Sequence, residues 1–225
     1  MNKLGEKINF KKAKFPSNKF LIGKYVILEP LNPTAHSKKL YSNFILDKKN
    51  LNWKYLPYGP FNNINLFTQW LKSDCLNKDP FFYAIYSKNH AQYCGMASYL
   101  RILPEHGSTE VGHINYSPIL QNTVESTEAM FLMMNNAFEK LGNRRYEWKC
   151  NNLNEDSKKA AIRLGFTFEG IFRQMNIFKG RNRDTAWFSI IDKEWGKIKK
   201  QYQKYLQKNN FEKNLKQKKK LIIIN

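Results

Sequence analysis

Apolar residues recur along this chain at two spacings, and the spacing changes from segment to segment. Alternating apolar and polar residues indicate strands, whereas apolar residues three and four apart indicate amphipathic helices. We expect strands at 24–30, 81–86, 92–103, 109–116, 144–150, 166–178 and 184–191. We expect helices at 34–47, 62–75, 123–141, 155–164 and 193–208. Successive long strands followed by strand–helix alternation predict an α/β domain whose mixed sheet has helices on both faces.

Proline and glycine residues mark the ends of several elements. Pro30 and Pro33 end the first strand, and Gly142 ends the long helix. The segment 179–184 has the composition of a hairpin turn between the last two strands. The aromatic segment 53–61, which contains two prolines and a glycine, predicts a shaped loop between the first two helices.

The region from 144 to 170 combines a strand, an Asn-rich turn, a short helix and a second strand. Asn154 is a good helix N-cap, and Glu155 and Asp156 suit the positive end of the helix dipole. Gly165 supplies a left-handed helix stop, after which Phe166 begins a strand-like alternation.

This unit resembles the C-terminal half of the GNAT acyltransferase fold, in which N…N..S..A..LGF..EG is a recurring signature. Three further blocks, in the family's order, resemble the RimJ/RimL-type branch of protein N-acetyltransferases. They are W-K-Y-L-P-Y-G-P-F at 53–61, E-V-G-H-I-N-Y-S-P at 110–118 and G-R-N-R-D-T-A-W at 180–187. The resemblance covers roughly residues 20–195. It implies a mostly antiparallel sheet of about seven strands that splays in the middle, and direct acetyl transfer from acetyl-CoA to a primary amine.

The resemblance places the coenzyme A phosphates at the turn before the 123–141 helix, where backbone N–H groups and the helix dipole attract anions. Gln121 fits the first position of the family's turn, but Val124 stands where the family has glycine. Asn122 is able to adopt a left-handed conformation, and Thr123 is able to cap the helix. These four residues are the expected phosphate-binding segment.

The strand at 109–116 is expected to carry the pantetheine arm, with Ile114 near the acetyl group and Tyr116 beside the cofactor. Alternation predicts Glu110, Gly112, Ile114 and Tyr116 on one face and Val111, His113 and Asn115 on the other. Glu110 is the candidate general base, because GNAT enzymes often place a carboxylate on this strand; the alternative is an ion-paired or exposed glutamate. His113 is the second candidate base, with a core histidine as its alternative.

Many GNAT enzymes protonate the leaving thiolate with a tyrosine, but no tyrosine occurs between Trp148 and Gln201. Ser157 stands at the corresponding place, and its hydroxyl is able to donate a hydrogen bond to sulfur. Asn154 would bind the pantetheine or position Ser157. Helix capping is an alternative role for both residues, and the two roles are compatible.

The acceptor side is expected to be lined by the aromatic loop, through Trp53, Tyr55 and Tyr58. Aromatic residues in such loops also serve as core residues, so both roles stay open. Arg173 and Arg183 are candidates for binding a carboxylate or an acidic peptide, the alternatives being ordinary surface arginines and, for Arg183, a turn-stabilising pair with Asp184.

Length and charge divide the chain of 225 residues into one domain with two basic ends. We expect a flexible arm at 1–20, a domain at 21–195, and at 196–225 a basic helix followed by a disordered tail. Most of the net charge of +20 lies in the ends, because 1–24 hold seven Lys and one Glu, and 193–225 hold eleven Lys and two Glu. Such lysine runs are either merely solvated or steer the chain toward an acidic partner such as ribosomal RNA.

Cysteine usage and hydropathy bear on the compartment. Cys75, Cys94 and Cys150 show neither a pairing pattern nor metal-ligand spacing, which favours reduced thiols in a cytosol and no metal. The sequence has no apolar run of about 18 residues and no apolar N-terminal signal segment. We therefore expect a cytoplasmic protein without a membrane partner, as a monomer or a homodimer.

Three functions stay open. The first is a RimJ/RimL-type N-acetyltransferase acting on a protein N-terminus, for example of a ribosomal protein. The second is the same enzyme class acting on a small amine such as an amino acid, a polyamine or an antibiotic. The third is a non-catalytic GNAT-fold protein that binds RNA or a ribosomal partner through its basic tails.

Overall fold

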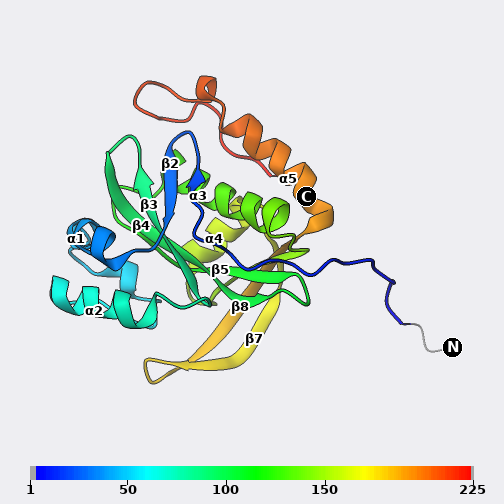
Figure 1. The fold of residues 1–225 in the computed structure, drawn as a ribbon, viewed down its shortest axis with the longest axis horizontal. Coiled ribbons are helices and arrows are strands. Elements are labelled where there is room, and N and C mark those ends of the chain that lie inside the picture. Colours follow the sequence, from blue (N-terminus) through cyan, green and yellow to red (C-terminus); the bar gives the residue numbers. More distant parts are fainter. Residues whose placement is uncertain (1–3, 224–225) are drawn as a thin grey trace.

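One eight-stranded sheet organises the chain, and helices cover both of its faces (Figure 1). The computed structural model describes residues 4–223. The strands are β1 (Leu21–Ile22), β2 (Val26–Pro30), β3 (Phe81–Ser87), β4 (Gln92–Leu103), β5 (Ser108–Tyr116), β6 (Arg145–Asn151), β7 (Thr167–Phe178) and β8 (Arg181–Ile191). The helices are α1 (Pro33–Phe44), α2 (Ile64–Asp74), α3 (Val124–Asn135), α4 (Glu155–Arg163) and α5 (Asp192–Tyr205). Short 3-10 turns lie at Leu51–Trp53 and Lys208–Asn210.

The sheet has the order β1-β2-β3-β4-β5-β6-β8-β7, and every neighbouring pair is antiparallel except the parallel pair of β5 and β6. This confirms the predicted mixed, mostly antiparallel sheet. All seven expected strands form, and the two-residue β1 is an eighth strand too short to leave a periodic signal. None of the helices within residues 4–223 has the length and apolarity needed to cross a bilayer.

Two differences from the expected boundaries have local causes. The helix expected at 123–141 changes after Asn135 into a π-helical turn, Asn136–Lys140. The turn between the last two strands is shorter than expected, because Lys179 and Gly180 both have positive φ and β8 already begins at Arg181.

Two hydrophobic clusters fill the two sides of the sheet. On one side α1 and α2 pack through Leu40, Phe44, Phe67 and Leu71, all of which are buried. On the other side α3 and α5 pack on the sheet through a cluster that contains Met133 and the fully buried Tyr99, Tyr146 and Tyr202. The helices therefore cover both faces of the sheet.

The pairing of β5 with β6 stops halfway along β5. Residues Ser108 to Val111 pair with Arg145 to Trp148, and the pairing ends there. The remainder of β5 pairs only with β4, so the side of β5 that faces β6 is an open edge. This is the splay that the sequence resemblance predicts.

A bulge in β5 changes which side chains share a face. Its register with β4 shifts between Ser98, which pairs with Gly112, and Met96, which pairs with Asn115, and His113 has φ 51°. Ile114 and Tyr116 consequently join the cluster on the α3 side. The predicted simple alternation is therefore wrong beyond Gly112, because one extra residue inverts the face of every following side chain.

The two ends of the chain contact the domain. The Ala13 and Lys14 N–H groups donate to the carbonyls of Pro104 and Leu141. Phe211 and Leu221 are buried in the cluster on the α3 side. The sequence does not predict these contacts, because isolated apolar anchors within a lysine-rich segment leave no periodic signal. The flexible arm at 1–20 and the disordered tail stay predictions, and their residues 1–3 and 224–225 lie outside the described residues.

The tail contact predicts a contrast between two neighbouring residues. Leu221 is 7% exposed and Ile222 is 68% exposed. Leu221→Ala should lower the free energy of unfolding by about 2 kcal/mol, because it removes buried apolar surface, whereas Ile222→Ala should be near neutral. Urea denaturation of the two variants measures this, and equal effects would show that the tail does not pack as described.

Candidate active site

The opening between β5 and β6 is bordered by three segments. The end of β5 leads into α3, the end of β6 leads into α4, and the loop that follows α1 contacts both. In that loop the Asn52 amide donates to the Tyr116 carbonyl at 2.8 Å, and the Tyr55 hydroxyl donates to the Leu153 carbonyl at 3.0 Å. The loop after α1 thus spans the opening from the β5 side to the β6 side.

The start of α3 has the local geometry that the sequence predicts. Thr123 caps the helix by accepting from the Ser126 N–H at 3.1 Å, and Asn122 is left-handed with φ 58°. The first N–H groups of a helix have no intrahelical partner, so donors remain available here. Val124 is buried in the core, and buried Glu125 accepts from the Ser87 hydroxyl at 2.9 Å. Val124, which stands where the family has glycine, and its neighbour Glu125 therefore both point inward.

Gln121 is held at the end of β5. Its amide donates to the Asn52 amide oxygen at 2.7 Å and to the Tyr116 carbonyl at 3.0 Å. The hydroxyl of Tyr116 reaches the Ser126 carbonyl, at 3.5 Å. Asn52 is a site residue that the sequence analysis missed, because it precedes the aromatic block and carries no motif of its own.

Across the opening, Asn154 and Ser157 belong to the start of α4. The Asn154 side chain accepts from the Ser157 N–H at 3.2 Å, which confirms helix capping. The Ser157 hydroxyl accepts from the Trp148 indole N–H at 3.0 Å. Ser157 also bonds to the Cys150 thiol, whose pKa is raised by burial, and this bond opposes the rise. Ser157 is therefore oriented by β6.

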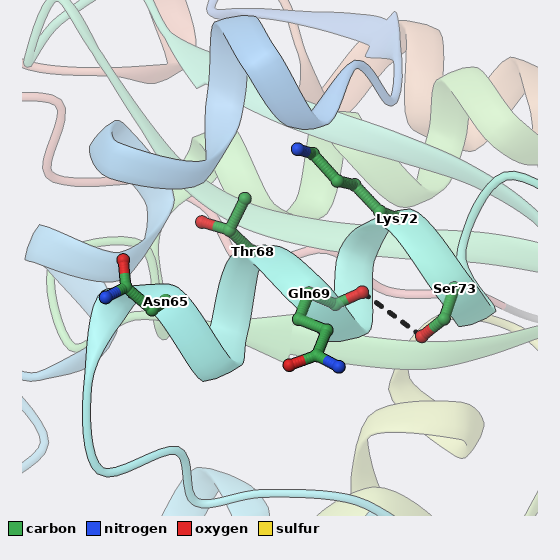
Figure 2. Close-up of a pocket in the computed structure, with 5 residues that line it drawn as sticks. All are labelled: Asn65, Thr68, Gln69, Lys72 and Ser73. Carbon is green, nitrogen blue, oxygen red and sulfur yellow. Dashed lines mark hydrogen bonds between the residues drawn. The ribbon is translucent and has the colours of Figure 1, made fainter.

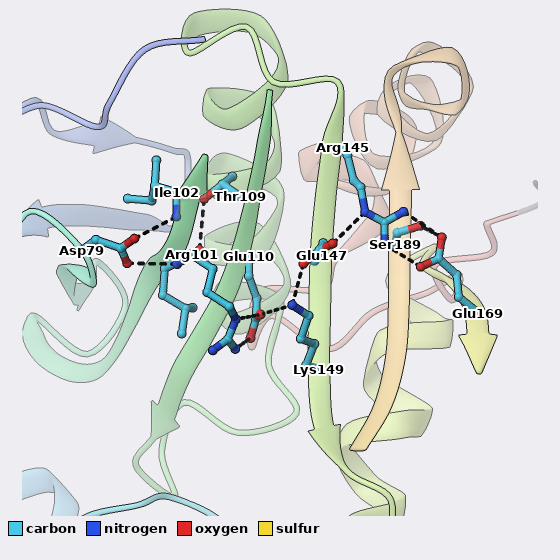
Figure 3. A network of polar contacts seen from close by, with 11 residues as sticks. Asp79, Arg101, Ile102, Thr109, Glu110, Arg145, Glu147, Lys149, Glu169 and Ser189 are labelled. Carbon is cyan, nitrogen blue, oxygen red and sulfur yellow. Dashed lines mark hydrogen bonds and ion pairs between the residues drawn. The ribbon is translucent and has the colours of Figure 1, made fainter. Parts of the chain in front are cut away.

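Glu110 is buried in the paired half of β5, and both of its carboxylate oxygens are bound. Arg101 donates to both of its carboxylate oxygens at 2.6 Å, and the Lys149 ammonium lies 3.1 Å from one of them (Figure 3). Burial raises the pKa of the Glu110 carboxyl, while Arg101 and Lys149 act against that rise. Arg101 lies in a bulge of β4 with φ 47°, a strained conformation for a non-glycine residue.

The same charges continue across the sheet as an alternating row (Figure 3). Lys149 bridges from Glu110 to Glu147 at 2.7 Å, and Arg145 bridges from Glu147 at 2.7 Å to Glu169. The Ser189 hydroxyl donates to Glu169 at 2.6 Å. The row links five strands on the side of the opening where β5 and β6 are still paired. No local sequence pattern predicts these cross-strand partners.

His113 lies on the β5 bulge against the aromatic loop. Its Nδ1 is 2.9 Å from the Tyr58 hydroxyl, and its ring packs on Phe82. Burial, and after it the nearby Arg101, lower the pKa of His113 to about 4. Burial also raises the pKa of Tyr58. Both groups are therefore neutral near pH 7.

The predicted acceptor residues divide into two groups. Tyr55 and Tyr58 lie at the opening through the contacts given above. The Trp53 ring is instead 4% exposed and packs among the rings of the α1–α2 cluster, so the structure does not bring it to the site. Arg173 is exposed in an irregular segment of β7, on the hairpin that projects from the domain (Figure 1). Its side chain acts electrostatically on Asp184.

A shallow hollow lies apart from this opening, on the outer side of α2 (Figure 2). Its volume is about 520 Å³, and it is lined by Asn65, Thr68, Gln69, Lys72 and Ser73. All five residues come from one exposed helix face, and they offer no pair of groups suited to acid–base or nucleophilic chemistry. Within the described chain, no group of three or more His, Cys, Asp or Glu side chains is arranged to hold a metal ion.

The comparisons with known proteins agree with this geometry. The family model described as acetyltransferase (GNAT) domain matches residues 26–167. A GCN5-related N-acetyltransferase from Brucella melitensis is 40% identical, with a TM-score of 0.92, over 95% of this chain and 96% of that one. A probable GNAT-family acetyltransferase from Chromobacterium violaceum is 38% identical, with a TM-score of 0.80, over 87% of this chain and 98% of that one. The chain therefore belongs to the GNAT acetyltransferase family, and it is an N-acetyltransferase.

More distant likeness concerns the fold alone. RimL, described as a ribosomal L7/L12 alpha-N-protein acetyltransferase, is 19% identical, with a TM-score of 0.66, over 77% of this chain and 94% of that one. No curated protein matches the chain. Members of the GNAT family use acetyl-CoA as co-substrate, and the acceptor is not fixed by these likenesses.

The low pKa of His113 predicts a specific pH dependence of stability. The folded value of about 4 lies below the usual 6.5, so between these pH values the unfolded chain binds more protons. The stability that His113 contributes should be complete above pH 6.5 and fall as the pH drops toward 4. The difference in unfolding free energy between the wild type and His113→Gln should shrink over this window by up to about 3 kcal/mol.

Denaturation at several pH values measures this difference. His106→Gln is the matched control, because His106 is exposed in the β4–β5 turn. A His113→Gln difference that stays constant from pH 4 to 6.5 would contradict the buried, neutral imidazole.

Proposed function

We propose that this chain transfers the acetyl group of acetyl-CoA directly to a primary amine held at the opening between β5 and β6. The observation that carries the proposal is the open edge of β5, from Gly112 to Tyr116, which ends beside the capped start of α3. An open strand edge offers N–H and C=O groups to an extended ligand, and a helix N-terminus offers donors to an anion. The two features together suit an amide-containing arm that ends in phosphates.

The residues at the opening fit acetyl-CoA by their chemistry. The backbone at Asn122, Thr123 and Val124 would receive the pyrophosphate, and Gln121 would fix the shape of that turn. The open edge beside Ile114 and Tyr116 would pair with the pantetheine amides. The thioester supplies an acyl group already activated for attack by an amine.

The proton transfers fall to side chains on the two borders of the opening. Ser157 accepts a hydrogen bond from the Trp148 indole, and its own O–H would donate to the departing sulfur in place of the Cys150 thiol. Asn154 holds the backbone of Ser157. Glu110 remains the proposed general base, acting through water after partial release from Arg101. His113 is less suited to that role near pH 7, because its pKa of about 4 makes it a weak proton acceptor.

The acceptor would lie under the loop after α1, beside Tyr55 and Tyr58. A protein N-terminus, as in a RimJ/RimL-type enzyme, and a small amine both present the primary amine that the reaction needs. The support for a protein N-terminus is the fold shared with RimL and the four sequence blocks. Direct transfer is proposed because the three cysteines in the chain are buried, so none offers an acyl-carrying thiol at the surface.

The role given to Ser157 predicts a loss in the chemical step. Ser157→Ala should lower kcat at least about tenfold, because the departing sulfur loses its hydrogen-bond donor. Binding of acetyl-CoA, measured by calorimetry, should change little. Ser42→Ala on the exposed side of α1 is the matched control and should leave both quantities unchanged.

Acetyl transfer to a panel of amines and N-terminal peptides is measured by the amount of coenzyme A thiol that is released. An unaltered kcat in a correctly folded Ser157→Ala protein would remove Ser157 from the mechanism. Absence of any acetyl-CoA binding by the wild type would contradict the enzymatic proposal. Binding to RNA or a ribosomal partner through the basic tails would then become the leading alternative.

A further inference from the structure

Three polar atoms on one face of β8 are buried without a hydrogen-bond partner. They are Arg183 Nε, Thr185 Oγ1 and Trp187 Nε1. Alternate residues of a strand point to the same face, so the three side chains form one column. The large majority of buried polar atoms in proteins have a hydrogen-bond partner. Three unpaired atoms at alternate positions of one strand therefore need a physical reason.

The column lies on the same face of the sheet as Glu110, the proposed general base. Trp187 pairs in register with Lys149, and the Lys149 ammonium lies 3.5 Å from the centre of the Trp187 ring. Lys149 in turn binds Glu110, so the column shares the face that carries the charged row of Figure 3. The column continues that row toward the hairpin end of β8.

The unpaired polar atoms of β8 begin at the level where the pairing of β5 with β6 ends. On the paired side, Ser189 has its partner in Glu169, and Lys149 has two carboxylates. Beyond the splay, Thr185 has no partner although it is only 3% exposed. On the opposite border, both amide atoms of Asn115 are also buried and unpaired. Unsatisfied polar atoms therefore border the opening from both strands.

The chemistry of the column points to a ligand rich in oxygen acceptors. Arginine and tryptophan N–H groups only donate, and the threonine hydroxyl is able to donate. Within the described chain, no carboxylate forms an ion pair with Arg183, because the neighbouring Asp184 carboxylate binds the Gln174 N–H and the Asn182 amide instead. Arg183 is thus a partly buried cation that packs over the Phe178 ring, at 5.6 Å from its centre, and makes no direct ion pair, in contrast to Lys149, Arg101 and Arg145.

We infer that Arg183, Thr185 and Trp187 form an acceptor subsite for an amine that also carries a carboxylate. The inference rests on the proposed function, since it assigns the second group of the same acceptor. The carboxylate would come from the α-carboxyl of an amino acid or from an acidic side chain of an N-terminal peptide. A planar guanidinium suits a carboxylate through two parallel hydrogen bonds, with the Thr185 hydroxyl completing the contact.

Binding of acetylated product analogues tests the subsite without requiring turnover. Calorimetry with coenzyme A present compares N-acetylglycine with N-acetylglycinamide, and an acetylated dipeptide amide ending in glutamate with its glutamine counterpart. The wild type should bind at least one acid about tenfold more tightly than its amide, and the pair that shows this identifies the source of the carboxylate. Arg183→Gln should abolish the difference while binding the amides as before.

Arg181→Gln is the matched control, because Arg181 is an exposed arginine two residues earlier on the same strand. It should keep the preference for the acid, and melting curves verify that the variants are folded. Equal affinity for acids and amides in the wild type, or no measurable binding of either acid, overturns the subsite. Binding of coenzyme A, measured first, reports separately on the proposed function.

Discussion

The separation of β5 from β6 after Val111 is the constraint on which the site depends. Backbone N–H and C=O groups need partners, and a sheet that opens in its middle leaves them unpaired on its inner edges. The bulge at His113 and the tie from Asn52 to the Tyr116 carbonyl hold the free half of β5 away from β6. In the proposed function, an extended ligand between the strands would restore the missing hydrogen bonds.

The charged row stabilises the paired segment next to the opening. Glu110 and Glu147 are register partners on the parallel pair, and two like charges in that position repel each other. Lys149, only 7% exposed, lies between them and binds both. Burying such charges gives little net stability, but breaking the set would leave an unpaired charge. The row therefore lies at the end of the paired segment, and the unpaired polar atoms of β8 begin directly beyond it.

Local signals in the sequence predicted the order of elements and the two helix starts that border the site. The caps at Thr123 and Asn154 and the left-handed Asn122 depend on neighbours within a few residues. The exchange of faces on β5 was not predictable, because a bulge leaves the alternating pattern intact. The partners of Glu110 were missed for another reason: Arg101 and Lys149 lie on different strands and meet it only through the sheet register. Trp53 belongs to one of the sequence blocks that resemble the family, but its ring is buried in the hydrophobic core.

Hydrogen exchange of the wild type with and without acetyl-CoA tests the central claim most directly. Saturating acetyl-CoA should slow exchange at the amides of 112–116 and 122–125, by up to about 100-fold when its concentration is 100 times the dissociation constant. The amides of 108–111, which lie in the paired half of β5, should change far less. Binding that leaves 112–116 unprotected, or that protects residues only outside the opening, would contradict the account.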